Sequence, residues 1–301
     1  MTIPWIFPGL IPPIDLGITV GSGIAAAAFL LLALRLGKVA RANRRLEAQA
    51  ESLARELEKT SRTLREALMA IENENFTDPL TDLHNRRYLS AVIQADVAKV
   101  LQAYRDPGSG APESRDLVFL MVDLDHFSLV NEYHGSAAGD QMLVAVARTL
   151  RRIFHESDAV IRWGGEEFLV VVRDATRSRA SEMAERIRRA MADERLETPK
   201  GEILQWTCSV GFAVFPFQAE DHSWMGWDRV VEVSGACLAV AKKSGRNAWV
   251  GVQAREGLEG ARHGARIPRE LCQLVDEGVL EVLSNREDPF GKIKKVGEIL
   301  G

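Results

Sequence analysis

The stretch AVIRWGGEEFLVVV, residues 159–172, places two glycines and two glutamates between two apolar runs. Each run has the length and apolar character of a buried β-strand. Gly164 and Gly165 between them predict a tight hairpin, because glycine supplies the positive φ angles that primed turns require. Glu166 and Glu167 then lie at the turn, where acidic side chains are either solvated surface charges or parts of a site.

A second acidic feature follows the most apolar run of the chain. In DLVFLMVDLDHF, residues 116–127, six apolar residues end at Val122 and are followed by Asp123 and Asp125. Carboxylates at the end of a buried strand cost free energy unless something compensates their charge. A divalent cation bound together with substrate phosphates is a common compensator, so these residues favour Mg²⁺ (or Mn²⁺) with a nucleotide.

The region around these motifs predicts an α/β fold. Apolar strands alternate with helical patterns from residue 76 to residue 252, and one pair of strands is joined by the hairpin, which indicates a mixed central sheet flanked by helices. The helices are expected at about 85–104, 137–154, 177–194 and 227–243, and the further strands at 117–123, 203–215 and 247–252. A polar loop is expected over 106–116.

The N-terminal region contains an uncharged stretch of 19 residues, from Leu16 to Leu34, about the length that a helix needs to cross a bilayer. We therefore expect a short extracytoplasmic segment over 1–15 and a transmembrane helix over 16–36. A cleaved signal peptide is the alternative, but the preceding residues are proline-rich and lack Lys and Arg. Basic residues follow the stretch, so the positive-inside rule places the rest of the chain in the cytoplasm.

Residues 37–75 predict a coiled-coil helix. Apolar or small residues recur at alternating steps of four and three, and no Pro or Gly interrupts the stretch between Lys38 and Phe76. A parallel two-stranded coil would bury so narrow a stripe, whereas a solvated spacer helix is the alternative. The stripe comprises Leu46, Ala50, Leu53, Leu57, Thr60, Leu64, Ala67 and Ile71.

Composition narrows the possible partners. The chain has 301 residues with a formal charge of -4, so no basic field indicates binding to nucleic acid. Cys208, Cys237 and Cys272 are odd in number and lack metal-ligand spacing, which suits structural thiols in a reducing compartment. Residues 253–301 predict a helix at PRELCQLVDEGVLEVL and contain a basic KIKK, but no role follows from them.

Four motifs together resemble the diguanylate cyclase (GGDEF) family. They are DPLTDLHNRR, DLDHFSLVNEYHGSAAGDQML, RWGGEEF and AKKSGRN, in the order and approximate spacing of that family, and the resemblance covers about residues 76–252. It implies a fold related to nucleotide cyclases and polymerase palms. The implied activity is condensation of two GTP into cyclic di-GMP and two pyrophosphates, for which two domains must meet face to face. Together with the predicted span and coiled coil, this favours a homodimer at the bacterial inner membrane.

The resemblance also implies roles for individual residues. Asp123, Leu124, Glu166 and Glu167 resemble the metal ligands, with Glu166 a further ligand or the base that assists the 3′-hydroxyl. Asn131 and Asp140 resemble the guanine-binding pair, and His126, Phe127, Lys242 and Arg246 the phosphate-binding residues. Without the motif, Asp140 would be a first-turn acid and Lys242 and Arg246 cations at a helix C-terminus. For Asp125 a structural role is as well supported as a functional one.

The chain departs from the family pattern at several positions. Ser128 stands where a phosphate-binding lysine is usual, and further departures are Glu132, Ser136, Gly235 and Ala239. His155 replaces the arginine of the product-binding inhibitory site, although Asp158 is retained. Histidine cannot reproduce the donor fork of arginine, so we expect weak or absent product inhibition.

Three functions remain open from the sequence. A membrane-tethered cyclase paired by its coiled coil is favoured, because the acidic, guanine-binding and phosphate-binding pairs are intact. The alternative is a degenerate domain that binds GTP or cyclic di-GMP as a receptor or scaffold, and Ser128 and Gly235 favour it. A cyclase with another cyclic nucleotide as product is disfavoured by Asn131 and Asp140. A signal would arrive through the span, a partner protein or an upstream sensor.

Overall fold

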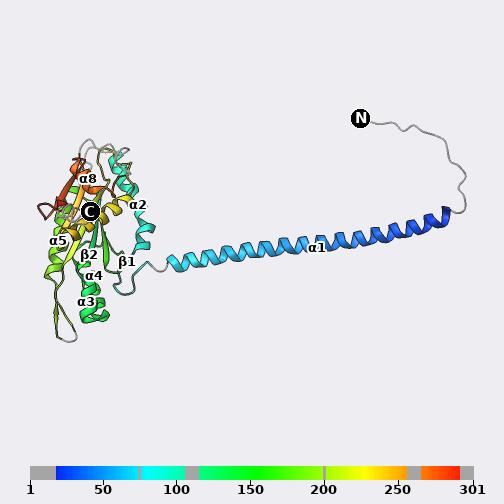
Figure 1. The fold of residues 1–301 in the computed structure, drawn as a ribbon, viewed down its shortest axis with the longest axis horizontal. Helices are drawn as coiled ribbons and strands as arrows, with labels where there is room; N and C mark the ends of the chain where they lie inside the picture. The colour runs from blue at the N-terminus through cyan, green and yellow to red at the C-terminus, as the bar shows by residue number, and fades with distance from the viewer. Residues whose placement is uncertain (1–17, 74–75, 106–114, 199–200, 256–265, 292–301) are drawn as a thin grey trace, which may run out of the picture. The chain divides into compact units, whose positions relative to one another are not determined.

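The computed structural model describes residues 18–73, 76–105, 115–198, 201–255 and 266–291. The chain divides into two compact units, residues 1–74 and residues 75–301 (Figure 1). The segment predicted over 1–15, residues 106–114 of the predicted loop and the basic KIKK lie outside the described residues.

The first unit contains one helix, α1 (Ile18–Asn73), which runs unbroken for 56 residues. This confirms the predicted continuity from the uncharged stretch into the heptad region. Within the described part of the chain, no helix is both long and apolar enough to cross a membrane. The predicted span begins at residue 16, outside the described residues, and membrane anchoring stays a prediction.

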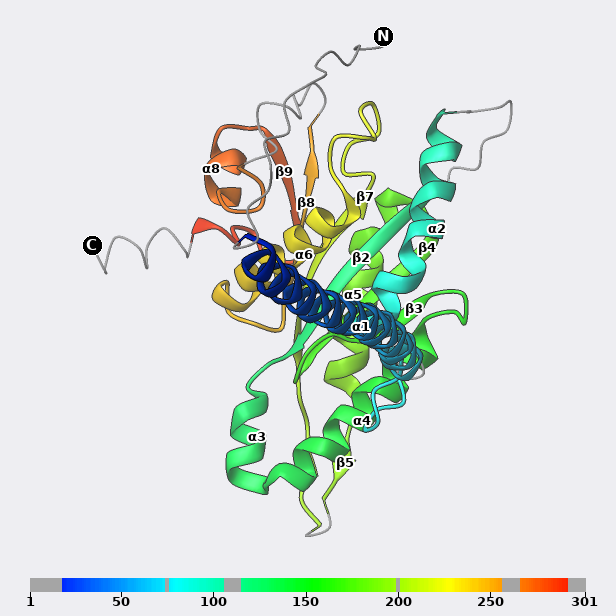
Figure 2. The ribbon, with the colours of Figure 1, turned by 90° about the vertical axis from the view of Figure 1, so that its right-hand side faces the viewer.

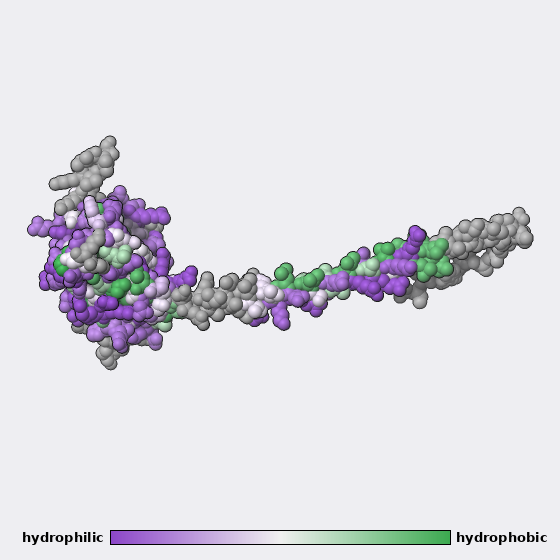
Figure 3. Space-filling view, turned by 90° about the horizontal axis from the view of Figure 1, so that it is seen from below, coloured by the Kyte–Doolittle hydropathy of each residue, from purple (hydrophilic) through white to green (hydrophobic). Residues whose placement is uncertain are grey.

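Large apolar side chains lie exposed along the described part of α1, and Figure 3 shows them as patches of hydrophobic surface on that helix. Leu46, Leu53 and Leu57 of the heptad stripe are each more than half exposed. A single helix cannot bury such a stripe by itself, so the exposed side chains agree with the pattern that predicted a coiled coil.

The second unit is built on a seven-stranded mixed sheet in the order β1-β3-β4-β2-β7-β8-β9. Two neighbouring pairs, β1 with β3 and β7 with β8, are parallel, and the other pairs are antiparallel. The central β2 is buried at every position, as its unbroken apolar run predicts. The strands are β1 (His84–Asn85), β2 (Asp116–Leu124), β3 (Ala159–Arg162), β4 (Glu167–Ala175), β7 (Cys208–Phe215), β8 (Trp249–Ala254) and β9 (Leu280–Ser284).

Helices cover both faces of this sheet, which confirms the predicted α/β class. One apolar cluster joins the sheet to α4 (Ser136–Ile153) and α5 (Ala180–Asp193). A second cluster joins the other face to α2 (Arg86–Arg105), α6 (Trp227–Lys243) and α8 (Leu271–Asp276). In Figure 2, α3 (Phe127–His134) and β5 (Leu196–Glu197) lie at the lower end of this unit, and α8 and β9 lie beside β8 at the upper end.

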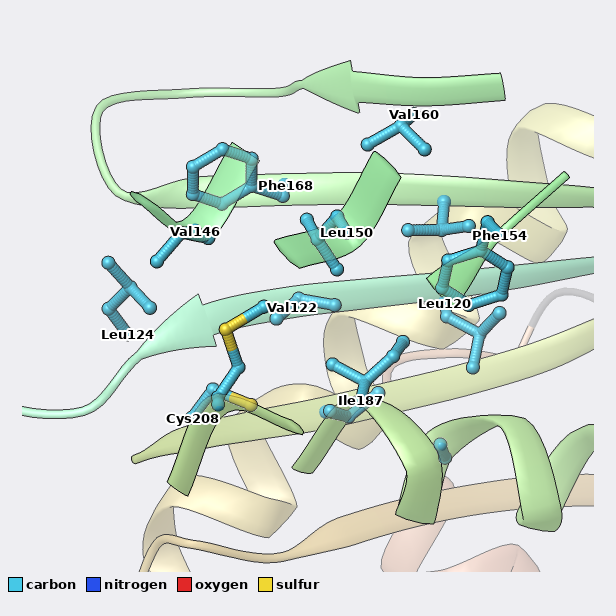
Figure 4. Close-up of a cluster of buried hydrophobic side chains, with 14 of the residues drawn as sticks. Leu120, Val122, Leu124, Val146, Leu150, Phe154, Val160, Phe168, Ile187 and Cys208 are labelled. Atoms are coloured by element: carbon cyan, nitrogen blue, oxygen red, sulfur yellow. The ribbon is translucent and has the colours of Figure 1, made fainter. Parts of the chain in front are cut away.

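The first cluster shows why the sequence pattern fixes these layers. Leu120, Val122 and Leu124 alternate along β2 and point toward α4 and α5, where Leu150 and Ile187 meet them (Figure 4). Alternate side chains of a strand point to opposite faces, so the intervening residues of β2 pack in the second cluster. None of the three cysteines forms a disulfide in the structure, and burial raises the pKa of Cys237 to about 12.

Two local predictions were wrong. A short helix, α3 (Phe127–His134), follows β2 and was not predicted, because its eight residues are too few for a clear period. The strand expected over 203–215 is interrupted: β6 (Ile203–Leu204) pairs with β5 (Leu196–Glu197) in a separate ribbon, and only β7 joins the main sheet. A short 3₁₀ turn, η1 (Arg177–Arg179), precedes α5.

The helix predicted at PRELCQLVDEGVLEVL forms only in part. It is α8, which ends at Asp276, and Gly278 then adopts a φ of 71° that reverses the chain. The following LEVLS is β9, which pairs antiparallel with β8 at the sheet edge. The described part of the C-terminal region therefore extends the sheet, a role that the sequence did not reveal.

Two glycines make a matched test of the packing between β7 and α6. A Cβ on Gly211 would lie 2.1 Å from the Ser234 carbonyl and the Leu238 amide, whereas a Cβ on Gly235 would meet nothing within 4 Å. We expect Gly211→Ala to lower the free energy of unfolding by about 2–3 kcal/mol through overpacking. Gly235→Ala should raise it by about 0.5–1 kcal/mol, because alanine is the better helix former. Urea unfolding followed by circular dichroism measures both, and equal effects would contradict the close helix–strand contact.

Candidate active site

Asp123 is the centre of the candidate site. It lies near the end of β2, opposite Glu167 on β4 and opposite Ser209 on β7. The Asp123 side chain is almost fully buried, and Lys242 Nζ of α6 lies 2.6 Å from its Oδ2 atom. The other oxygen, Oδ1, is buried and has no hydrogen-bond partner among the described residues.

The surroundings of Asp123 shift its protonation. Burial raises the pKa of this carboxyl to about 6, Lys242 opposes the shift, and the charges of Glu166 and Glu167 add to it. The single ammonium of Lys242 therefore opposes the burial of Asp123 and the charges of Glu166 and Glu167, which leaves negative charge that is only partly compensated. A buried oxygen without a partner in such a field is the kind of acceptor that binds a cation.

The predicted hairpin is present, but its two glycines do not adopt the positive φ angles that were expected. The loop spans Trp163 to Glu166, and the amides of Trp163 and Gly164 both donate to the Glu167 carbonyl, at 2.8 and 3.2 Å. Neither Gly164 nor Gly165 has a φ in the left-handed region, so the primed-turn prediction was wrong. A Cβ on Gly164 would lie 3.0 Å from a Glu167 carboxylate oxygen, so close packing is the constraint there.

Arg162 ties this turn to the start of the domain. Its Nη2 donates to the Gly165 carbonyl at 2.9 Å, and its Nη1 donates to both oxygens of Asp78, at 2.9 and 3.1 Å. Burial alone would raise the pKa of Asp78, but bonds from Thr81 and Arg162 lower it below its usual value. Asp78 and Arg162 belong to two of the quoted motifs, and their contact was not predicted from the sequence.

The donor set fits a hard divalent cation. Asp123, Glu166 and Glu167 offer carboxylate oxygens, and Leu124 offers a main-chain carbonyl, which are the ligands that Mg²⁺ and Mn²⁺ prefer. The orphaned Oδ1 of Asp123 provides a buried acceptor for such an ion. Among the residues that the structure describes, no three His, Cys, Asp or Glu side chains already converge as a metal-binding group.

Asp125 has a structural role. Both of its carboxylate oxygens are occupied: Ser209 Oγ donates to Oδ1 at 2.7 Å, and Thr207 Oγ1 and the Asn247 amide donate to Oδ2 at 2.6 and 2.8 Å. This buried carboxylate thus joins the end of β2 to β7 and to the loop after α6. Of the two aspartates that the sequence singled out, only Asp123 keeps an oxygen for a ligand.

Asn131 and Asp140 are brought together across the α3–α4 pair. The Asn131 side chain packs against Gly139, where a Cβ would lie 2.0 Å from Asn131 Oδ1. Gly139 therefore lets Asn131 lie beside the helix that carries Asp140, and Asp140 is exposed. The structure places the predicted pair on neighbouring helices, with Asp140 open to solvent.

The phosphate-binding candidates come from two helix ends. His126 has a φ of 61° and precedes α3, and no side chain caps the helix there. The Phe127 and Ser128 amides at the start of α3 lie at the positive end of the helix dipole, and the Leu129 amide donates to the His126 carbonyl at 3.0 Å. The Phe127 ring is buried in the core. Ser128 is exposed in this first turn.

The second helix end is the turn after α6, which carries Arg246. Gly245, Arg246 and Asn247 have consecutive φ values of 119°, 58° and 44°, all in the left-handed region. Such angles are costly for residues other than glycine, so neighbouring groups must hold this turn. The Arg246 side chain is exposed there, one turn beyond Lys242.

A family model described as "Diguanylate cyclase, GGDEF domain" matches residues 75–248, more than half of the chain. The chain belongs to this family. The match covers every part of the candidate site described above, and it ends one residue before β8 begins.

Named relatives of the GGDEF domain include two diguanylate cyclases. Diguanylate cyclase DosC of Shigella sonnei is 31% identical over 170 residues, which cover 56% of this chain and 34% of DosC. Diguanylate cyclase DgcP of Pseudomonas aeruginosa is 34% identical over 171 residues, covering 57% of this chain and 23% of DgcP. The chain thus spans about a third or less of the length of these relatives.

Solved structures of similar chains include the GGDEF domain of DgcB from Caulobacter crescentus in complex with c-di-GMP. It is 27% identical, covers 57% of this chain and 90% of that one, and has a TM-score of 0.48. Diguanylate cyclase SiaD in complex with its activator SiaC, from Pseudomonas aeruginosa, is 28% identical, covers 76% of this chain and 80% of that one, and has a TM-score of 0.46.

The inhibitory-site candidates lie on the loop before β3 of the GGDEF domain. Both oxygens of Asp158 accept main-chain bonds, from the His155 amide at 3.0 Å and from the Arg173 amide at 3.1 Å. A cavity of about 330 Å³ beside them is also lined by Arg179 and Arg186. Asp158 thus braces its own loop in the structure.

A half-buried ion pair between Glu185 and Arg188 supports the turn that carries Arg246. Arg188 Nη1 donates to Asn247 Oδ1 at 2.7 Å, and Glu185 holds Arg188 through two bonds of 2.8 Å. Glu185 also accepts from Trp249 Nε1 at 3.0 Å. The bond from Arg188, together with those from Arg189 and Trp249, lowers the pKa of Glu185 to about 2, although burial alone would raise it.

The low pKa of Glu185 predicts a pH-dependent contribution to stability. A carboxyl whose pKa falls from 4.5 to about 2 on folding stabilises the fold fully above pH 4.5, and this stabilisation is lost as the pH falls toward 2. Glu185→Gln should lower the free energy of unfolding at pH 7 by about 1–2 kcal/mol through loss of charged hydrogen bonds.

Urea unfolding at pH 7, 5 and 3 tests this expectation. The difference between Glu185→Gln and the parent should be constant from pH 7 to 5 and smaller at pH 3. Glu182→Gln, on the exposed surface of the same helix, is the matched control and should change stability little. A difference that grew on acidification would contradict the assigned pairing.

Proposed function

We propose that this protein is a diguanylate cyclase, which condenses two GTP molecules into cyclic di-GMP and releases two pyrophosphates. The observation that carries the proposal is the buried Asp123, with one unpartnered oxygen, directly opposite Glu167 of the GGEEF turn. The family match and the names of the relatives support the same activity.

The side chains divide the work of binding. Asn131 and Asp140 would hold the guanine base, with the Asp140 carboxylate accepting from its ring and exocyclic N–H groups. Lys242 and Arg246, with the main-chain amides of His126 and Phe127, would bind the phosphates. Because Ser128 replaces a lysine, this chain relies on Lys242 and Arg246 for its cationic contacts.

The acidic residues would hold a divalent cation, Mg²⁺ or Mn²⁺, through Asp123, Glu166, Glu167 and the Leu124 carbonyl. When bound, such a cation neutralises charge that builds up as the 3′-hydroxyl of one GTP attacks the α-phosphate of the other. Glu166, half-buried at the turn, would be either a further ligand or the base that accepts the proton of that hydroxyl. Burial of Asp123 keeps the field in the site strong, because water screens it less there.

Two copies of the domain must act together, since each would bind one GTP. The exposed apolar stripe of α1 supports a parallel coiled coil that brings two domains together. The uncharged stretch from Leu16 to Leu34 and the basic residues after it support attachment to the bacterial inner membrane, with the catalytic domain in the cytoplasm. A signal would then reach α1 from a partner or an upstream sensor.

A receptor for GTP or cyclic di-GMP is the second candidate, and Ser128 is the observation that favours it. A phosphate contact that strengthens in the transition state contributes more to the reaction rate than to the affinity for the nucleotide. Its loss would therefore lower turnover more than it lowers nucleotide binding. Product formation by the purified chain separates the two functions.

The direct test compares the parent with Glu167→Gln and with Glu220→Gln, an exposed glutamate on another loop. Incubated with GTP and Mg²⁺, the parent and Glu220→Gln should yield cyclic di-GMP by chromatography and mass. Glu167→Gln should lower the rate by roughly 100-fold or more, because a ligand charge is removed at the reacting centre. Bound GTP without product in the parent would identify a receptor instead.

Product inhibition provides a separate prediction. Histidine lacks the donor fork of arginine, and Asp158 already accepts two main-chain bonds, so cyclic di-GMP should inhibit the parent weakly. His155→Arg should strengthen inhibition by roughly tenfold. Initial rates at increasing cyclic di-GMP measure both, and strong inhibition of the parent at submicromolar product would contradict this expectation.

A further inference from the structure

The C-terminal segment after β8 lies outside the residues that the family model matches, yet it reaches the candidate site. β9 pairs antiparallel with β8 from Val250 opposite Ser284 to Ala254 opposite Leu280. Figure 2 shows β9 beside β8, at the edge of the sheet. The chain therefore leaves β9 next to the first residues of β8, which directly follow the turn that carries Arg246.

A set of short bonds fixes the end of β9 to the start of β8. Ser284 Oγ donates to the Trp249 carbonyl at 3.0 Å, and the Trp249 amide donates to Asn285 Oδ1 at 2.9 Å. The Arg286 amide donates to Ser284 Oγ at 3.0 Å, so the backbone of Arg286 is held in place as well. These bonds aim the Arg286 side chain at the neighbouring turn.

Arg286 contacts the main chain of that turn directly. Its Nη2 donates to the Arg246 carbonyl at 2.8 Å and reaches the Asn247 carbonyl at 3.5 Å. Asn247 is also held from the other side, because its amide donates to Asp125. The left-handed residues Arg246 and Asn247 thus lie between a carboxylate from the sheet centre and a guanidinium from the C-terminal segment.

We propose that Arg286 is a positioning residue that holds Arg246 ready to bind the phosphates of GTP. A turn with consecutive left-handed residues would relax toward commoner angles if its carbonyls lost a charged donor. Relaxation would swing the exposed Arg246 side chain away from the phosphate position, which weakens nucleotide binding without touching the acidic residues that carry the chemistry. This inference rests on the proposed function, because it takes GTP as the ligand.

The test uses the full chain with Arg286→Ala, Arg286→Lys and the control Arg269→Ala, which removes an exposed arginine from the same segment. Binding of a fluorescent GTP analogue with Mg²⁺ and steady-state kinetics are measured side by side. Arg286→Ala should weaken binding and raise KM by roughly tenfold, the scale of one charged hydrogen bond, while kcat stays within about twofold. Arg286→Lys should restore part of the affinity, because an ammonium can still donate to one carbonyl.

Thermal unfolding and hydrogen exchange over residues 245–249 accompany these measurements. Faster exchange there in Arg286→Ala, at an unchanged melting temperature, is the expected result. Unaltered GTP binding in Arg286→Ala, or an equal loss in Arg269→Ala, would overturn the positioning role, as would a fall in kcat at constant KM. If Arg286→Ala does not fold, Arg286→Lys decides by the same binding assay.

The two proposals fail differently. A parent that binds GTP without forming cyclic di-GMP would refute the cyclase, and the binding measurement would still decide the role of Arg286. A parent that binds no GTP would overturn both.

Discussion

The burial of Asp123 is the constraint on which the candidate site depends. A carboxylate on the central strand of a seven-stranded sheet loses its hydration. Among the described residues, only the ammonium of Lys242 compensates its charge. The uncompensated oxygen and the raised pKa follow from that imbalance. A sheet built for stability alone would place an apolar residue here, so the cost points to a ligand that supplies the missing charge.

The strands and turns around Asp123 fix which residues lie opposite it. β2 is flanked by β4 and β7 over its whole length, so the register that brings Glu167 opposite Asp123 is fixed by many apolar pairs and not by the acids themselves. Hydrogen bonds made by two charged side chains, Arg162 and Asp125, then hold the flanking turns in place. Arg162 joins the GGEEF turn to Asp78, and Asp125 joins β2 to the turn after α6.

The turn after α6 has strained backbone angles, and three side chains hold it in place. Its left-handed residues are held by Asp125, by Arg188 through Asn247, and by Arg286 from the segment after β9. The first two contacts lie within the part of the chain that the family model matches, and the third lies beyond it. The segment after strand β9 therefore adds a contact to the turn that carries Arg246, although its sequence indicates no such role.

The sequence alone determined the class of fold, the buried strand that ends in Asp123, the hairpin with its two glutamates and the long N-terminal helix. Those features follow from local periodicity and from motifs whose residues are close together in the chain. Only the tertiary structure decided that Asp125 has a structural role and that Lys242 pairs with Asp123. It also decided that the second part of the last predicted helix is the strand β9. These outcomes depend on contacts between segments far apart in sequence, where neither spacing nor composition specifies which partner a polar group will meet.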